Sequence, residues 1–441
     1  MKRLHIHLWA LLYLCFGSVL SAYAVPAIQT ATLDNGLKIL LIEAHNVPMV
    51  SMQLSMPAGS RFDTEGKAGT ASMLAEMLSD HTAKHDNKAW AEWLDSEAIR
   101  LGASASRDTL SLSLTVVKES LAVGLDAFSE ALLQPGWHKK RFALLREDSV
   151  AAAVKAQETP GSQAARATAA LLYGTHGYGH TTSGTAESLS HIKLNDLKSL
   201  YTRQIQPIGS VLAISGDITM QEVLSLLAPR VKAWKGTPKV AALVIAQPQV
   251  VKGLSRQVYI PTSQTLVQFS RLGITRSNND FFPLFVMNHL LGGGGFGSKL
   301  MEEVREKRGL VYGVYSYFIP LAAPGPFVIT LQTQAGQAEQ AAQVVRDVMQ
   351  SLVDGKIDKK QLDATKNNLI GSFAQRMDSN RERVGLLSMI GFYQMPLDYL
   401  ERWTAHVQSV TLADVQRMSK DYLQTDDWNI IQVGSTKEKA Q

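Results

Sequence analysis

The sequence predicts an α+β protein made of two homologous domains of about 200 residues each, in which a mainly antiparallel sheet packs against helices. Length is the first reason, because a chain of 441 residues exceeds what one hydrophobic core usually holds. The order of the elements is the second, because strand patterns occur in pairs followed by runs of helical patterns, without strict β-α-β alternation. An internal repeat is the third.

The repeat is a similarity between the end of the first half and the end of the second half. Residues Leu194–Gln206 align without a gap on Leu412–Gln424, at a spacing of 218 residues. In both copies a helical pattern gives way to a short apolar strand, at Val211–Ile214 and at Ile430–Val433. A duplicated domain explains this better than chance.

Each half mixes a period of two, expected for strands, with the period of 3.6 expected for helices. In the first half we expect strands at 36–42, 49–56 and 110–114, and helices at 68–79, 88–101, 120–133 and 139–154. In the second half we expect strands at 257–260, 266–269, 312–318 and 327–333, and helices at 281–291, 337–353 and 359–373. A segment with two prolines and few charges predicts a linker at 237–250, between domains at 25–236 and 251–441.

The N-terminus has the features of a secretory signal. Lys2 and Arg3 precede the apolar stretch Leu8–Leu20, and Ala22-Tyr23-Ala24 offers the small residues that signal peptidase accepts. We therefore expect residues 1–24 to be removed and the protein to be periplasmic. The alternative is a retained anchor, for which this stretch is short of the ~20 residues that span a bilayer.

Composition excludes several classes of protein. The net charge of +5 falls to +3 without Lys2 and Arg3, which is too weak to indicate a nucleic-acid binder. Aromatic residues make up 7% of the chain and the mean hydropathy is −0.03, so the chain is not disordered, and no second long apolar run predicts a membrane span. The only cysteine, Cys15, lies in the leader, so we expect no disulfide, cysteine-bound metal or cysteine nucleophile.

Six motifs follow one another along the chain in a characteristic order. They are Thr32–Leu37, Ala58–Phe62, Gly69–Leu78, Leu291–Leu300, Arg305–Tyr312 and Met395–Tyr399. In order and spacing, essentially the whole chain after the leader resembles the M16 (pitrilysin-like, M16B-type) zinc peptidases. The resemblance implies the two-domain α+β fold of the M16/LuxS-like metallohydrolases.

The zinc motif of that family is missing here. Active members carry His-x-x-Glu-His on a helix after a Gly-x-Ala turn, where two histidines bind zinc and the glutamate polarises the metal-bound water. The resemblance places Ser72, Ala75 and Glu76 at those positions. The third ligand, a glutamate about 77 residues further on in the family, falls near Ala153. We therefore expect no metal and no cofactor on this chain.

Substitute sites remain as alternatives. His81 and His85 are four residues apart beside Asp80 and Asp86, so weak metal binding is one reading, and a solvated helix end is the one we favour. His176 and His180 lie in a glycine-rich turn, where we expect a structural role. Gly292 to Gly295 follow a helix pattern, and no Gly-Lys-Ser/Thr comes after them, which argues against a phosphate loop.

The other half of the family's site is present. In active relatives an arginine and a tyrosine seven residues later hold the substrate backbone and stabilise the developing oxyanion; Arg305 and Tyr312 match them. Without the resemblance to the family, we would expect Arg305 to be a solvated helix residue and Tyr312 to be a core strand residue. Arg308 is the neighbouring candidate.

The resemblance thus implies a zinc-less pseudo-peptidase subunit that forms a heterodimer with a zinc-bearing M16 homologue. Such a chain is no enzyme by itself, supplies its Arg/Tyr pair to the partner's site, and takes part in peptide hydrolysis there. One alternative is a non-catalytic structural or peptide-binding homologue, similar to the core proteins of respiratory complexes. A distant third is a self-contained zinc peptidase with an atypical site at His81 and His85.

Overall fold

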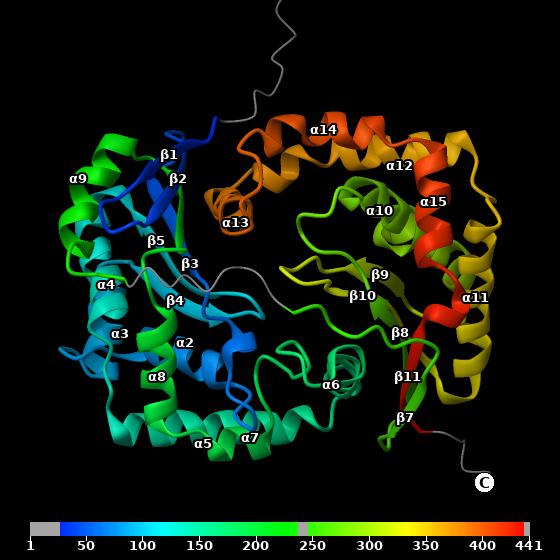
Figure 1. Ribbon diagram of the computed structural model, residues 1–441, viewed down its shortest axis with the longest axis horizontal. Helices are drawn as coiled ribbons and strands as arrows, with labels where there is room; N and C mark the ends of the chain where they lie inside the picture. The colour runs from blue at the N-terminus through cyan, green and yellow to red at the C-terminus, as the bar shows by residue number, and fades with distance from the viewer. Residues whose placement is uncertain (1–26, 237–245, 436–441) are drawn as a thin grey trace, which may run out of the picture.

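The computed structural model describes residues 27–236 and 246–435, as two halves that each contain one sheet with its helices (Figure 1). The leader expected at 1–24 and residues 237–245 of the expected linker lie outside the described residues.

The first sheet has six strands in the order β1-β2-β6-β3-β5-β4. Only β2 and β6 run parallel, and every other neighbouring pair is antiparallel. In the middle of the sheet Leu54 pairs with Leu112 on one side and with Leu212 on the other, and all three are buried. The strands are β1 (Gln29–Thr32), β2 (Lys38–Glu43), β3 (Met49–Met56), β4 (Arg100–Ala105), β5 (Leu110–Val117) and β6 (Val211–Gly216).

The second sheet has five strands in the order β7-β11-β8-β10-β9 and repeats this plan. Its last strand, β11, lies parallel to β7 and antiparallel to β8, as β6 lies between β2 and β3. The mainly antiparallel α+β architecture predicted from the sequence is confirmed. The strands are β7 (Ser255–Tyr259), β8 (Gln264–Leu272), β9 (Val314–Phe318), β10 (Pro326–Gln334) and β11 (Asn429–Gly434).

The helices surround these sheets. Those of the first half are α2 (Thr70–Asp80), α3 (Asn87–Ser96), α4 (Leu121–Leu133), α5 (Lys139–Ala156), α6 (Pro160–Tyr173), α7 (Ala186–His191), α8 (Leu194–Gln204) and α9 (Met220–Val231). Those of the second half are α10 (Phe281–Asn288), α11 (Ala338–Val353), α12 (Lys359–Gly371), α13 (Asn380–Phe392), α14 (Tyr399–Ser409) and α15 (Leu412–Tyr422). The two copies of the sequence repeat form α8 with β6 and α15 with β11, and each pair starts 218 residues apart.

Two predicted helices were too long. The helix expected at 88–101 ends at Ser96, and Arg100–Ala105 form the edge strand β4 instead. Between them Ala98 has a φ of 52°, a left-handed conformation that breaks the helical path. The helix expected at 281–291 ends at Asn288 and continues as a π-type turn, His289–Gly293.

The two halves exchange a helix. Helix α6 of the first half packs on β8 and β11 of the second sheet, where Ala164 and Ala167 contact the apolar face of β11. Helix α13 of the second half packs on β2, β3 and β6 of the first sheet, where Leu387 and Ile390 join Leu40 in one core (Figure 1). Since each sheet buries apolar surface under a helix from the other half, neither half has a complete core of its own.

A buried carboxylate joins segments of both halves. Asp108, in the turn between β4 and β5, is wholly buried and accepts hydrogen bonds from the hydroxyls of Tyr178 and Tyr393 and from the N–H of Ala322. Its distance to the Tyr393 hydroxyl is 3.0 Å, and its distance to Nε of Arg61 is 3.8 Å. Burial raises the pKa of both tyrosines, so both remain protonated hydrogen-bond donors.

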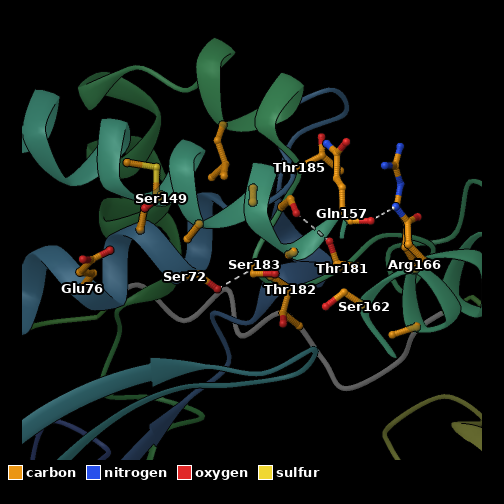
Figure 2. A pocket seen from close by; sticks show the side chains of 18 of the residues that line it. Ser72, Glu76, Ser149, Gln157, Ser162, Arg166, Thr181, Thr182, Ser183 and Thr185 are labelled. Carbon is orange, nitrogen blue, oxygen red and sulfur yellow. Dashed lines mark hydrogen bonds between the residues drawn. The ribbon is translucent and has the colours of Figure 1, made fainter. Parts of the chain in front are cut away.

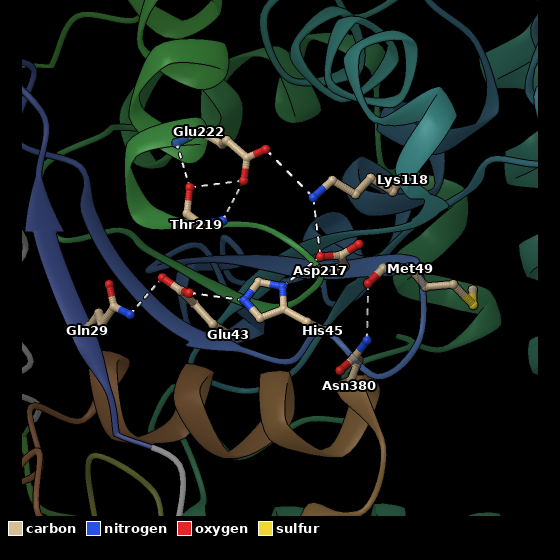
Figure 3. A network of polar contacts seen from close by, with 9 residues as sticks. All are labelled: Gln29, Glu43, His45, Met49, Lys118, Asp217, Thr219, Glu222 and Asn380. Atoms are coloured by element: carbon tan, nitrogen blue, oxygen red, sulfur yellow. Dashed lines mark hydrogen bonds and ion pairs between the residues drawn. The ribbon is translucent and has the colours of Figure 1, made fainter.

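A polar network lies where α13 meets the first sheet (Figure 3). Nδ1 of His45 lies 2.6 Å from Asp217, and its Nε2 lies 3.2 Å from Glu43. Lys118 reaches the same Asp217 at 3.2 Å, and Asn380 at the start of α13 donates to the carbonyl of Met49 at 3.3 Å. The hydrogen bonds to Asp217 and Glu43 raise the pKa of His45 above its usual 6.5.

The exchanged helix α13 gives a stability test. A Cβ at Gly391 would lie 2.4 Å from Cγ1 of Val211 and 3.2 Å from Cδ1 of Leu40, so Gly391→Ala overpacks the shared core. We expect it to lower the free energy of unfolding by about 1–3 kcal/mol. Gly385→Ala in the same helix meets no atom within 4 Å, and should be neutral or stabilise by up to about 1 kcal/mol. Equal effects of the two substitutions in urea unfolding would contradict this packing.

The network at His45 gives a test by NMR. The pKa of His45, followed by its imidazole resonances, should lie above 6.5, and Asp217→Asn should lower it. Because the folded pKa exceeds the unfolded one, this interaction stabilises the fold below about pH 6.5 and is lost as the pH rises through the raised pKa. A His45 pKa at or below 6.5 in the unsubstituted chain would show that the two carboxylates do not hold the imidazolium.

Candidate functional site

A cavity of about 610 Å³ lies beside α2, with the end of α5, the start of α6 and the loop 181–185 as its other walls (Figure 2). The chain enters α2 through Gly69, whose φ of +100° favours glycine. Asp63 accepts hydrogen bonds from the N–H groups of Gly69 and Ala71, both at 2.8 Å, and so fixes the first turn of the helix. Burial raises the pKa of Asp63 to about 7, although these hydrogen bonds favour its ionised form.

The structure brings the family's zinc positions together in this cavity. Ser72 and Glu76 line it from α2, and Ala152 and Ala153 line it from α5. The Ser72 hydroxyl donates to the carbonyl of Thr182 at 2.7 Å (Figure 2). Burial raises the pKa of Glu76, and the nearby carboxylates of Asp80 and Asp148 raise it further. Ala75, the position of the missing base, is 1% exposed and does not line the cavity.

These residues do not fit zinc. A catalytic zinc needs three nitrogen, sulfur or oxygen ligands and an open position. At the family's zinc positions the cavity offers one carboxylate, a hydroxyl already hydrogen-bonded to a carbonyl, and two methyl groups. Over residues 27–236 and 246–435, no three His, Cys, Asp or Glu side chains are grouped so that they could hold a metal ion. We therefore derive no metal chemistry for this chain.

The histidine pair at His81 and His85 is not a solvated helix end, and that expectation was wrong. His81 is wholly buried, and its ring stacks on His138 with 4.7 Å between the ring centroids. Its Nδ1 lies 2.8 Å from Asp80, whereas Nδ1 of His85 lies 2.8 Å from Glu130. The two imidazoles thus bind two different carboxylates. These contacts fix the end of α2 and do not form a shared metal site.

Asp80 is also bound by an arginine. Nε and Nη2 of Arg141 donate to its two oxygens at 2.7 and 2.5 Å. Burial raises the pKa of Asp80, but the hydrogen bonds from His81 and Arg141 outweigh burial and hold it at about 2. This carboxylate is therefore ionised, and both of its oxygens accept hydrogen bonds.

The other two sequence features have structural roles. Nε2 of His176 lies 2.8 Å from the carbonyl of Ala246, and Nδ1 of His180 lies 3.1 Å from the carbonyl of Thr181. Gly292 packs against β9, because a Cβ there would lie 2.6 Å from Oγ of Ser316. Neither the two histidines nor the glycine run lines the cavity beside α2.

Arg305 and Tyr312 meet at the surface of the second half. The guanidinium carbon of Arg305 lies 5.4 Å from the ring centroid of Tyr312 and 4.6 Å from that of Phe296. Tyr312 precedes β9 and is 90% exposed, so the strand expected at 312–318 starts two residues later and Tyr312 is not a core residue. Arg308, the neighbouring candidate, is bound to Glu303 at 2.7 Å. Tyr312 lines a second cavity, of about 740 Å³, which shares no lining residue with the cavity beside α2.

No sequence motif points to Arg107, Asp108 or Tyr393. Arg107 lines the cavity beside α2, and the other two form the buried link between the halves. Tyr178, which completes that link, lies between His176 and His180 of the glycine-rich turn. Only the glycine-rich run marked that region as unusual.

The fold and the site define a class: a two-domain protein with the architecture of a zinc peptidase and without its zinc ligands. Two family profiles match it, "Insulinase (Peptidase family M16)" over residues 38–183 and "Peptidase M16 inactive domain" over residues 191–369. The crystal structure of a peptidase M16 inactive domain from Pseudomonas fluorescens is 33% identical, with a TM-score of 0.88 over 93% of this chain and 98% of that one. The chain belongs to the M16 family.

Two curated relatives from Helicobacter pylori align with most of the chain. The "Non-peptidase homolog YmxG" is 24% identical over 91% of this chain and 92% of that protein. The "Zinc protease PqqE" is 22% identical over 96% of both. Together with the missing ligands, the similarity to a non-peptidase homologue marks this chain as an inactive M16 homologue. In the part of the chain that the structure describes, no helix combines the length and apolarity needed to cross a membrane.

Zinc content tests the assignment of the α2 cavity. The purified chain should retain no stoichiometric zinc after dialysis, because Ser72, Glu76 and Ala153 provide one carboxylate and no imidazole. Elemental analysis measures this directly. The triple variant Ser72→His, Ala75→Glu, Glu76→His should still bind zinc poorly, and adding Ala153→Glu or Ala152→Glu should improve binding. About one tightly bound zinc in the unsubstituted chain would contradict the assignment.

Proposed function

We propose that this chain is the zinc-less subunit of a periplasmic heterodimeric M16 metallopeptidase, in which it supplies Arg305 and Tyr312 to the site of a zinc-bearing partner. One observation carries the proposal. The guanidinium and the phenol lie side by side at the surface, and neither lines this chain's own cavity beside α2. Because Tyr312 is exposed, Arg305 lies half-buried beside it, and neither belongs to this chain's own cavity, the pair is suited to act on another chain.

The chemistry of the pair suits peptide hydrolysis. The carbonyl oxygen of the scissile bond gains negative charge in the transition state, and fixed N–H and O–H donors stabilise that charge. The guanidinium of Arg305 lies near the rings of Phe296 and Tyr312 and forms no ion pair with any other residue of the described chain, so its N–H groups remain available. The partner's zinc supplies the activated water, which this chain cannot do.

The exposed rings favour a contact with another chain. Phe296 is 67% exposed and Tyr312 is 90% exposed, and both flank the same arginine. Aromatic residues and arginine are enriched where protein chains bind each other, because they bury much area and still form hydrogen bonds. In Helicobacter pylori, a protein named as a non-peptidase homologue and one named as a zinc protease are both similar to this chain. That division of roles supports the pairing, and the leader expected from the sequence at 1–24 supports the periplasm.

The proposal predicts the effect of two substitutions on the complex. Arg305→Ala or Tyr312→Phe should lower the turnover of the reconstituted heterodimer by about 10² to 10³, because each removes a donor that acts most strongly in the transition state. Peptide hydrolysis by the purified complex is the measurement. Thermal unfolding and size-exclusion chromatography show whether folding and pairing remain intact.

Arg308→Ala is the matched control, since Arg308 lies three residues away and binds Glu303 instead of the aromatic rings. It should leave turnover unchanged. Unchanged hydrolysis with the Arg305 and Tyr312 variants would favour a scaffold role. If each variant lost activity in parallel with a lower melting temperature, the two residues would serve packing.

A further inference from the structure

The cavity beside α2 is open although the family's zinc ligands are gone from it. Its volume of about 610 Å³ is in the range of sites that hold small ligands. Hydroxyl groups line much of it, from Ser72 and Ser149 on the helices and from Thr181 to Thr185 on the loop (Figure 2).

Two arginines line this cavity without an acidic partner. The guanidinium of Arg107 donates no hydrogen bond to any residue of the described chain, and its Nε is buried and unpaired. Its one ring contact is with Tyr173, at 6.0 Å. Arg166, at the rim, forms no ion pair within residues 27–236 and 246–435. Asp108, next to Arg107 in the chain, already accepts three hydrogen bonds.

The cavity therefore carries an excess of positive charge. Glu76 is the only carboxylate among its lining residues, against the two arginines. An unpaired guanidinium with a buried Nε loses hydration without gaining a partner. An anionic ligand in the cavity would give the other N–H groups of this guanidinium a charged partner.

We propose that this cavity binds the carboxylate of a short peptide, held by Arg107 and Arg166. A guanidinium binds a carboxylate through two parallel hydrogen bonds. The amides of Gln157 and Gln163 and the hydroxyls of the loop can hydrogen-bond to the peptide backbone, and the small side chain of Ala153 leaves room for it. A doubly charged anion such as phosphate fits less well, because Glu76 lies in the same cavity.

This inference goes beyond the proposed function, because it concerns this chain's own cavity and not the surface pair at Arg305. Its test needs no partner subunit, so either proposal can fail alone. The carboxylate can come from a peptide C-terminus or from an acidic side chain. We infer the C-terminus, because every short peptide has one, whatever its sequence.

Binding is measured by fluorescence anisotropy of the purified full chain with N-terminally labelled tetra-alanine. Three probes are compared: the free acid, the C-terminal amide, and the amide with glutamate as its last residue. The free acid should bind at least about ten-fold more tightly than either amide, because charge-assisted hydrogen bonds are lost in the amide. Equal binding of acid and amide would overturn the proposal. Preference for the glutamate amide would replace the C-terminus by an acidic side chain.

Three variants test the assigned residues. Arg166→Gln, on the exposed side of α6, should weaken binding of the free acid about ten-fold or more without loss of folding. Glu76→Gln should strengthen binding, because it removes the one acidic group. Arg256→Gln, an exposed arginine on β7, should change nothing. The proposal would be overturned if neither Arg166→Gln nor Glu76→Gln changed the affinity for the free acid. It would also be overturned if inorganic phosphate displaced the labelled probe at a lower concentration than the unlabelled peptide acid does.

Discussion

The carboxylate of Asp108 is the interaction on which the arrangement of the two halves depends. It is wholly buried, and it accepts hydrogen bonds from Tyr178 in the first half and from Tyr393 and Ala322 in the second. Removing one donor would leave a buried charge undersatisfied, which is far more costly than the loss of a surface contact. The position of this carboxylate and the exchange of α6 and α13 therefore support each other, because both require the same placement of the halves.

The contacts that hold the protein together explain why the cavity beside α2 keeps its shape although the zinc ligands are missing. A catalytic zinc contributes to chemistry more than to folding, and here α2 is held by protein contacts alone. Asp63 caps its first turn, Ser72 binds the carbonyl of Thr182, and Asp80 at its last residue is bound by His81 and Arg141. The helix thus keeps its place without zinc ligands.

Much of the fold could be predicted from local patterns, and the errors have physical causes. The strand β3 and the start of α5 lie where the periodicity placed them, because the alternation at 49–56 and the helical pattern from Lys139 are uninterrupted. The strand β4 was missed, because Arg100–Ala105 lie at a sheet edge and bury little on either face. The exchange of α6 and α13 has no local signal, since small apolar residues such as Ala164 and Ala167 do not reveal which sheet they cover.

The sequence by itself determined that this chain lacks the zinc site, because the side chains at Ser72, Ala75 and Glu76 limit the chemistry whatever their placement. It also determined the duplication, because a repeated pattern of apolar positions folds the same way twice. Only the tertiary structure decided that His81 is buried, that Tyr312 is exposed, and that Arg107 faces a cavity without an acidic partner. Burial and pairing are set by contacts between segments far apart in the chain, and no local pattern encodes them.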